Sequence, residues 1–257
     1  NPPIDPLRES IVMSLETCLG REQNVFEQSP EHADRLIISS PVLSNSKMHQ
    51  IRTLGRTGYE TIDIDLNYAE SEGLAAAIQR ICEVSAQAIR DGKTLLVLSD
   101  KKIREGYLPA SAVMATGAVH HYLIQQGLRT DANIIVETAV ARDPHQFAVI
   151  LGFGATAIYP YLAYDVINDL IAKGELLGDP IHAQANFRKG IEKGLLKVLS
   201  KMGISTVASY RGGQLFEAVG LSNEVVDTCF TVVPSSNQGE TIIDIENDQK
   251  KLAELAW

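Results

Sequence analysis

The chain has 257 residues, of which 45% are hydrophobic and 21% charged, the balance of an ordinary globular protein rather than a disordered one. It carries 23 lysines and arginines against 32 aspartates and glutamates, so its formal net charge is −9. A surface this acidic repels phosphate backbones, which argues against nucleic-acid binding as a main activity. No apolar run approaches the roughly 20 residues that a membrane-spanning helix needs, and no signal peptide opens the chain.

Three cysteines lie far apart without any CxxC spacing, at Cys18, Cys82 and Cys229. This pattern suits a reducing compartment and argues against a zinc or iron–sulfur site made from this chain alone. The sequence begins Asn-Pro-Pro rather than with Met. We therefore expect it to be a piece of a longer protein.

The first part of the chain is predicted to contain a proline-rich arm, a helix and short strands. Residues 1–7 are expected to be extended, because each proline disfavours helix in the residue before it. Asp5 is the expected cap of a helix with Pro6 in its first position, running to near Gly20. Further elements are expected as strands at 24–26, 36–39 and 59–66 and as a helix at 44–54.

From residue 70 onward, helices and strands alternate. Apolar residues at helical spacing indicate the helices, and short apolar runs between them are typical of parallel strands covered on both faces. The expected helices are 74–89, 110–126, 144–151, 164–172, 185–202 and 214–219, and the expected strands are 94–98, 132–136, 155–159 and 204–208. Such alternation predicts right-handed βαβ crossovers.

The predicted fold is therefore α/β, with mainly parallel βα repeats that follow the N-terminal arm and helix. Periodicity leaves an open sheet and a closed barrel as alternatives. We expect residues 1–257 to form one domain that ends in a turn-rich tail at 232–257, with an amphipathic end over 252–257.

Polar residues follow the predicted strands, and ligands of parallel α/β folds gather at the carboxyl ends of strands. These residues are Ser99, Asp100, Glu137, Thr138, Arg142, His145, Ser209, Arg211 and Gly212. They would make a polar pocket. The interpretation favoured by their positions is structural, because loops in α/β proteins are generally polar and Asp143 before Pro144 is a helix-cap pattern.

Three other patterns also favour structure over chemistry. Gly152-Phe153-Gly154 lies between a predicted helix and a predicted strand, the reverse of a dinucleotide-binding loop, so its glycines are expected to end the helix. His120 and His121 are adjacent on a helix and point about 100° apart, which excludes joint chelation of a metal. Lysines recur every four residues from Lys189 to Lys201. They are expected to form either a solvated helix face, which is the favoured interpretation, or a docking edge for an acidic domain.

Four long blocks of the sequence match a known family in order and over essentially the whole chain. They are NPPIDPLRESIVMSL at the start, LLVLSD at 95–100, ANIIVETAVARDPHQFAVILGFGATAIYPYLAY at 132–164 and KGLLKVLSKMGISTVASYRGGQLFEAVGL at 193–221. On these blocks the chain resembles the central domain of the glutamate synthase large (alpha) subunit. The segment ARDPHQFAV at 141–149 resembles the bacterial NADPH-dependent type more than the ferredoxin-dependent type.

The resemblance implies a cytoplasmic parent enzyme that makes two glutamates from glutamine and 2-oxoglutarate. An amidotransferase domain of the same chain would release ammonia, and an FMN domain with a 3Fe–4S cluster would reduce the 2-iminoglutarate formed from it. NADPH would supply electrons through a small subunit that carries FAD and 4Fe–4S clusters. The central domain would link the two catalytic domains, resemble a rudimentary or incomplete TIM-like barrel, and help wall the ammonia channel. No membrane or nucleic-acid partner is implied.

No catalytic, cofactor-binding or metal residue is carried over to this chain, because the family's nucleophilic cysteine and cluster cysteines have no counterpart here. The N-terminal block is expected to meet the flavin domain, since a proline-fixed arm loses little entropy on docking. Ammonia must be kept from water and acids, so small or hydroxyl residues at strand ends are expected to line its channel. Interdomain candidates are Asn1, Pro2, Pro3, Asp5, Pro6, Arg8 and Met13, and channel-lining candidates are Ser99, Thr138, Ser209 and Gly212.

Two other functions are compatible with the residues. One is a free-standing α/β-barrel enzyme that acts on a small anionic metabolite through Glu137, Arg142, His145 and Arg211. The other is a purely structural scaffold without a channel role.

Overall fold

A parallel sheet of four strands organises the computed structural model, which describes residues 2–257. Its strands are β3 (Thr61–Asp65), β5 (Leu95–Ser99), β7 (Asn133–Glu137) and β8 (Ala157–Tyr159), and they lie side by side in chain order. This order is that of one arc of a βα barrel. β3 and β8 are the two ends of the arc and do not pair with each other, so the sheet is open. The predicted α/β fold with mainly parallel βα repeats is confirmed.

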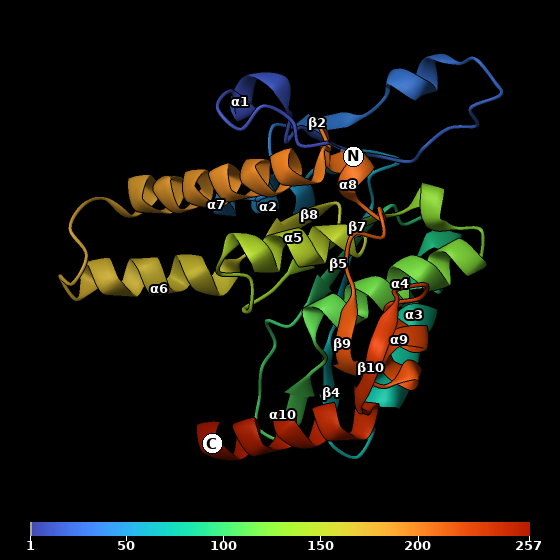
Figure 1. Cartoon of the computed structure of the whole chain (residues 1–257), viewed down its shortest axis with the longest axis vertical. Coiled ribbons are helices and arrows are strands. Elements are labelled where there is room, and N and C mark those ends of the chain that lie inside the picture. Colours follow the sequence, from blue (N-terminus) through green and yellow to red (C-terminus); the bar gives the residue numbers. More distant parts are fainter. Residues whose placement is uncertain (1) are drawn as a thin grey trace.

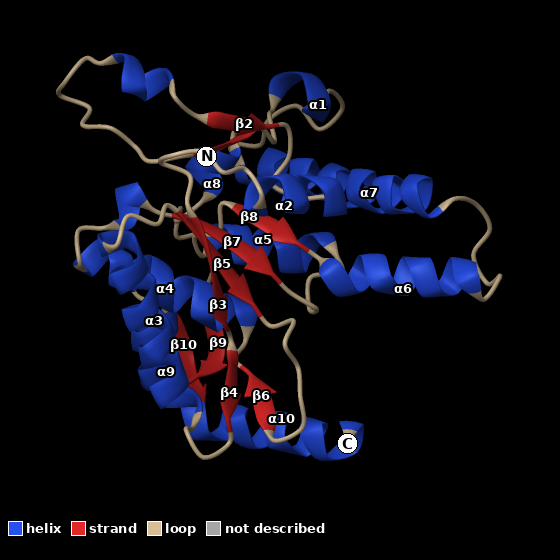
Figure 2. Ribbon diagram, turned by 180° about the vertical axis from the view of Figure 1, so that it is seen from behind, coloured by secondary structure: helices blue, strands red, loops and turns tan. Residues whose placement is uncertain are grey.

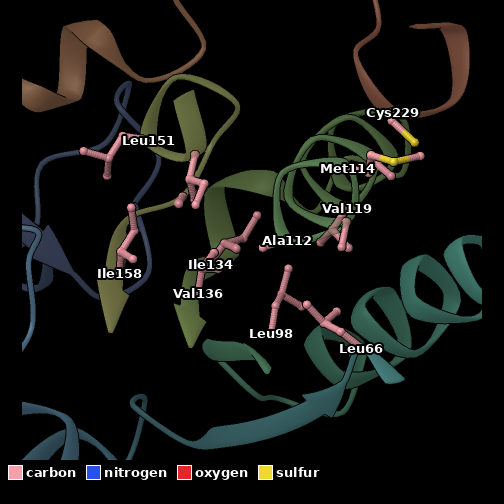
Figure 3. Close-up of a cluster of buried hydrophobic side chains, with 14 of the residues drawn as sticks. Leu66, Leu98, Ala112, Met114, Val119, Ile134, Val136, Leu151, Ile158 and Cys229 are labelled. Carbon is pink, nitrogen blue, oxygen red and sulfur yellow. The ribbon is translucent and has the colours of Figure 1, made fainter. Parts of the chain in front are cut away.

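The crossover helices cover one face of this sheet. They are α3 (Leu74–Arg90), α4 (Ala112–Gln125) and α5 (Pro144–Gly152), each lying between two consecutive strands of the sheet in the chain. Figure 3 shows Leu98, Ile134 and Val136 of the sheet facing Ala112 and Val119 of α4. All five are buried, and this layer forms the larger hydrophobic core.

The opposite face, which would line the interior of a closed barrel, is covered by the N-terminal part of the chain. Leu95, Val97 and Ile135 alternate with the residues of the first face and pack against Met48 and Ile51 of α2 (Asn45–Arg52). The antiparallel pair β1 (Thr17–Leu19) and β2 (Leu36–Ile38) adds Leu19 to the same cluster. A helix and a hairpin thus fill the place of the missing strands.

The remaining elements extend the two ends of the molecule, as Figures 1 and 2 show from opposite sides. α1 (Glu9–Val12) and the 3-10 turn η1 (Pro30–Ala33) lie at the end that holds the N-terminal segment, and α10 (Ile242–Ala256) lies at the other end. α6 (Tyr161–Ala172) and α7 (Pro180–Met202) pack together and project sideways from the sheet. The other elements are β4 (Asn67–Ala69), β6 (Tyr107–Pro109), η2 (Arg129–Asp131), α8 (Val207–Tyr210), β9 (Ala218–Leu221), α9 (Asn223–Cys229) and β10 (Ser235–Glu240).

Two predictions for the N-terminal part are wrong. The Asp5 carboxylate accepts the amides of Leu7 and Arg8 but caps no helix, because α1 begins only at Glu9, without a side-chain cap, and ends at Val12. Every second residue from Met13 to Leu19 is buried, which is the period of an extended chain. The strand predicted at 24–26 is a turn, in which the Asn24 side chain accepts the amide of Phe26 and so competes with strand pairing.

Two predictions near the end of α7 are also wrong. Residues 204–208 form no strand: Ile204 caps α7 by bonding the carbonyl of Leu199, and Thr206 starts the single turn α8. The helix predicted at 214–219 is replaced by a loop and by β9, which pairs in parallel with β10. The partner strand begins at Ser235, too far along the chain for local periodicity to reveal.

The tail at 232–257 is not turn-rich. It contains β10 and the 15-residue helix α10, which begins with a capping box between Thr241 and Asp244. Most side chains of α10 are exposed, but Ile242 is buried and Ile245 and Ala253 pack against the larger core. Polar contacts also hold the helix: Glu246 accepts the Leu74 amide at the start of α3, and Gln249 accepts the Tyr68 hydroxyl at 2.9 Å.

Candidate functional site

Two buried carboxyl groups lie at the carboxyl edge of the central sheet. Glu137, the last residue of β7, is 1% exposed and accepts both terminal nitrogens of Arg52 at 3.1 and 2.9 Å. The Ser99 hydroxyl donates to the same carboxylate at 2.5 Å. Arg52 comes from the last turn of α2 and also bonds Asp63 of β3 at 2.7 Å. One guanidinium therefore joins α2 to two strands of the sheet.

The second group, Asp100, follows β5 and is 4% exposed. It accepts the Thr138 hydroxyl at 2.5 Å and the Ala139 amide at 3.1 Å, and Tyr161 at the start of α6 bonds it as well. These bonds tie the loops after β5, β7 and β8 together. The Asp100 carboxylate thus serves as the common acceptor of three loops.

The two acids are shifted in opposite directions. Burial raises the pKa of Asp100 above its usual range, and the bonds from Thr138 and Tyr161 offset only part of this effect. Burial also acts to raise the pKa of Glu137, but the bonds from Arg52 and Ser99 outweigh it, so this pKa is lowered. Carboxyl groups pushed apart in this way are typical of acid–base pairs. Here both are saturated by donors of the chain itself, which makes the arrangement a structural network.

The four channel-lining candidates do not come together. The hydroxyls of Ser99 and Thr138 are buried and donate to the two carboxylates, whose presence conflicts with the need to keep acids away from ammonia. Ser209 is exposed in α8, and Gly212 lies just beyond α8 near His120. Neither of these two follows a strand end, because residues 204–208 are not a strand, and their place in a channel wall stays a prediction.

The residues of the alternative enzyme site are dispersed as well. Glu137 lies at the carboxyl edge of the sheet, whereas the Gly212 amide next to Arg211 bonds Gly152, which precedes β8 at the amino edge. Arg142 and His145 are exposed around the start of α5. Sequence reasoning missed Arg52, because 85 positions separate it from Glu137 and no motif links them.

The interdomain candidates at the N-terminus are partly docked on α7. The Ile4 amide donates to the Ser200 carbonyl at 2.9 Å, and the Lys197 ammonium pairs with Glu9 at 2.6 Å. Lys197 is one of the four lysines that recur from Lys189 to Lys201, and all four are exposed. Pro2, Pro3, Pro6 and Arg8 are exposed, Asp5 is half-buried and paired with Arg8, Met13 is a core residue, and Asn1 lies outside the described residues.

Large apolar side chains are exposed on the same N-terminal part of the molecule. Leu7 is 92% exposed, Ile11 78%, Val25 83%, Phe26 94% and Ile37 63%. Single exposed apolar residues are ordinary in proteins, but their concentration in one segment is typical of a surface that contacts another protein. We call these five residues the N-terminal apolar surface.

Residues 2–257 contain no group of three His, Cys, Asp or Glu side chains placed to hold a metal ion. Burial raises the pKa of the Cys82 and Cys229 thiols to about 12, which disfavours the thiolate form that metals require. Gly152 and Gly154 end α5, as predicted. No helix within the described part of the chain is long and apolar enough to cross a membrane.

Comparison with known families gives a match over most of the chain. The model of the glutamate synthase central domain matches residues 1–222. The glutamate synthase [NADPH] large chain of Bacillus subtilis is 40% identical over 98% of this chain, and the glutamate synthase [NADH] of Saccharomyces cerevisiae is 36% identical over all of it. The ferredoxin-dependent glutamate synthase of Pyropia yezoensis is 40% identical over all of it. The chain spans only 16, 13 and 18% of these three relatives, respectively.

Solved structures give weaker similarities. A flavocytochrome b2 mutant superimposes with a TM-score of 0.42 at 14% identity, covering 78% of this chain and 48% of that one. A dihydroorotate dehydrogenase (DHODH) from Eimeria tenella gives a TM-score of 0.39 at 15% identity, covering 59% and 38%.

Proposed function

The chain belongs to the glutamate synthase central domain family, and from this premise we propose that it is the connecting domain of a glutamate synthase large subunit. In this proposal residues 1–257 form one domain between an amidotransferase domain and an FMN domain of the same polypeptide. The parent reaction converts glutamine, 2-oxoglutarate and reductant to two glutamates in the cytoplasm. The observation that carries the proposal is the match to the family model over residues 1–222.

The cofactors of the parent reaction do not fit the residues of this chain. A 3Fe–4S cluster needs thiolate ligands, and Cys82 and Cys229 are buried with raised pKa values. The glycines of 152–154 close a helix rather than open one, so they offer no amide cradle to the FMN phosphate. We therefore assign FMN and the cluster to the neighbouring domain, and NADPH, FAD and 4Fe–4S clusters to a small subunit.

The linking role has a physical basis in the N-terminal apolar surface. Five large apolar side chains from one segment are left in water, and covering them with a neighbouring domain gains free energy at about 25 cal/mol per Å² of apolar surface. Leu7 and Ile11 lie in the part that is anchored to α7 through Ile4 and Glu9, whereas Val25 and Phe26 follow Glu22, whose amide donates to the Thr130 carbonyl at 3.0 Å. These anchors reduce the conformational freedom that is lost when the neighbour docks. A displacement of residues 4–9 on docking would therefore also act on α7, to which they are bonded.

This interface is tested in the full-length enzyme with Phe26→Asp. We expect it to uncouple glutamine hydrolysis from glutamate synthesis, because a charge in a desolvated contact is costly. Leu255→Asp is the matched control, since Leu255 is 85% exposed on α10 at the far end of the molecule. The measurement is the ratio of glutamine hydrolysed to glutamate formed. Equal ratios in the two variants would remove this assignment of the interface.

The channel role is tested by a bulky residue at Ser209, the channel-lining candidate that is exposed and in an unstrained backbone. Ser209→Trp should leave glutaminase activity intact while free ammonia accumulates in solution. Ser71→Trp, in an exposed turn before α3, is the control. If Ser209→Trp releases no more ammonia than the control, Ser209 is not part of the channel, and a scaffold without a channel role is favoured.

A further inference from the structure

Arg129 lies at the amino edge of the central sheet, opposite to the carboxylate network. One of its terminal nitrogens donates to the Ala132 carbonyl at 2.6 Å and the other to the Gly154 carbonyl at 3.0 Å, just before β7 and β8. Its Nε donates to Nδ1 of His120 at 2.8 Å. All three acceptors are neutral. The positive charge of Arg129 is therefore solvated by the protein without being neutralised.

Arg35 reaches the same edge from the segment before β2. Its Nε lies 3.2 Å from the position that a Cβ would take on Gly20, and the Gly20 carbonyl accepts the side-chain amide of Asn133, the first residue of β7. This Nε is buried and has no hydrogen-bond partner within residues 2–257. A buried donor without an acceptor costs free energy, so a missing acceptor is indicated here.

Arg211 completes the group from the end of α8. The next residue, Gly212, is bonded to Gly152 and lies beside the His120 ring, 3.5 Å from Nε2 to the position of an added Cβ. Burial lowers the pKa of Arg129 to about 10 and also lowers that of Arg211, and the charge of Arg211 adds to the effect on Arg129 as the charge of Arg35 does to that on Arg211. Arg211 thus lies near both other arginines, and we call the three residues the arginine cluster.

No carboxylate within the described chain forms an ion pair with any member of the arginine cluster. Six of the nine other arginines find such partners within the described residues, namely Arg8, Arg21, Arg52, Arg56, Arg80 and Arg104, whereas Arg90, Arg142 and Arg188 do not. The acid whose charge acts on Arg129 and Arg211 is Glu22, which is exposed and not paired with them. In a chain with a net charge of −9, a partly buried cluster of unneutralised cations is an exception.

We propose that the arginine cluster, Arg35, Arg129 and Arg211, binds a small anion that carries a phosphate or carboxylate group. Guanidinium groups match the paired oxygens of both anions, and half-buried charge-assisted bonds are stronger than those on the open surface. Arg129 uses three of its five N–H donors on the protein, which leaves two for a ligand. The bound anion would neutralise the charge repulsion that Arg211 exerts on Arg129 and that Arg35 exerts on Arg211.

His120 reports on this site without being a ligand of it. Because Arg129 donates to Nδ1, the ring proton is on Nε2 and the ring is neutral. Burial, with repulsion from Arg129 and Arg211 added, lowers the pKa of His120 to about 3. An anion in the cluster changes the field at this ring, so the ring nitrogens of His120 should respond to binding. His145, exposed on α5, should not.

The test is calorimetric titration of the full-length enzyme and of the 257-residue chain, with inorganic phosphate and with succinate as separate probes. We expect one site per chain for at least one probe, and the two titrations distinguish phosphate from carboxylate as the ligand group. Arg211→Gln should weaken binding roughly tenfold, the equivalent of one lost charge-assisted bond. Arg142→Gln, which removes an exposed arginine outside the cluster, should leave binding unchanged.

Arg35→Gln gives a second variant in case Arg211→Gln does not fold, and it should weaken binding to a similar extent. Nitrogen NMR of the histidine rings gives an independent readout, with His120 shifting on addition of the bound probe and His145 remaining still. Failure of both probes to bind at concentrations up to about 10 mM, equal weakening by Arg142→Gln, or an unresponsive His120 would overturn the proposal. Binding by the chain but not by the full-length enzyme would also overturn it, in favour of an acidic side chain of a neighbouring domain.

Discussion

Removal of the Arg52 guanidinium tests whether the carboxylate network holds the sheet together. In Arg52→Met the aliphatic stem remains, but Glu137 loses two of its three donors and keeps only the Ser99 hydroxyl. The Glu137 side chain is 2% exposed, so water cannot replace the lost bonds from most directions. The variant therefore leaves a buried carboxylate with a single partner.

The size of the effect follows from burial on the two sides of the pair. Breaking a fully buried ion pair by removing one partner costs about 3–5 kcal/mol. The Arg52 side chain is 31% exposed, so water enters the space it leaves, and we expect a loss of about 2 kcal/mol in the free energy of unfolding. For a domain of this size each kcal/mol lowers Tm by about 2–4 °C, which gives a total of about 4–8 °C.

Urea unfolding followed by circular dichroism measures this loss, and Arg56→Met is the matched control. Arg56 also pairs with a carboxylate, that of Asp34, but both side chains are about half exposed at 49% and 48%. Its removal should therefore change the free energy of unfolding by less than about 0.5 kcal/mol. Equal losses in the two variants would refute the argument that burial decides the strength of these pairs.

The pH dependence gives a second check with a definite sign. The folded-state pKa of Glu137 lies below its ordinary value of 4.5, so this group contributes stability that is present above pH 4.5 and lost as the pH falls through the folded-state pKa. In Arg52→Met the effect of burial, which raises this pKa, is opposed only by the bond from Ser99 and the charge of Lys101. The difference in the free energy of unfolding between Arg52→Met and the parent should therefore be largest at pH 7 and become smaller as the pH falls below 4.5. A constant difference over this range would contradict the assignment to Glu137.

Three further predictions concern packing and capping, all measured by urea unfolding. Gly117→Ala in α4 should lower the free energy of unfolding by about 1–3 kcal/mol, because the new Cβ would overlap the carbonyl oxygen of Cys229. Gly190→Ala in α7 should raise it by about 0.8–1 kcal/mol, since nothing lies within 4 Å of its Cβ position; a loss in Gly190→Ala or a gain in Gly117→Ala would contradict the respective prediction. Glu246→Ala removes the cap of the Leu74 amide, bonded at 2.6 Å, and should cost about 1 kcal/mol, whereas an unchanged midpoint would exclude a capping role.

The sequence predicts those parts of the fold whose stability is local. α3, β5 and β7 have continuous periodic patterns and were predicted near their observed positions. The parts that failed depend on partners distant in the chain. Residues 13–19 are extended because Met13 and Leu15 pack into the larger core, Leu19 packs on the inner face of the sheet and Ser14 bridges Thr206. β9 exists because β10 pairs with it. The capping box at Thr241 was the available local signal for α10.

The same distinction applies to the site residues. Glu137 and Asp100 were identified because polar residues after buried strands are conspicuous in a sequence. The donors to these two carboxylates are not identifiable from the sequence. Arg52 is 85 residues from Glu137, and the sequence predicts a channel wall for Thr138 rather than its bond with Asp100. Arg35 lies in no motif at all. Charge complementarity between distant segments leaves no periodic trace, so it becomes visible only when the fold brings the segments together.

The two edges of the sheet differ in a way that bears on what this domain can do. In βα barrels, ligands bind at the carboxyl edge, where strand ends present unsatisfied polar groups. Here that edge is closed by Arg52, Ser99 and Thr138, which saturate the two carboxylates. The amino edge, which in such folds usually serves stability, holds unneutralised arginines and a buried donor without a partner. In this domain a helix and a hairpin fill the inner face of the sheet, which lines the interior of a closed barrel. Ligand binding by the domain itself is therefore expected at the amino edge, and it would not require the chemistry of a barrel active site.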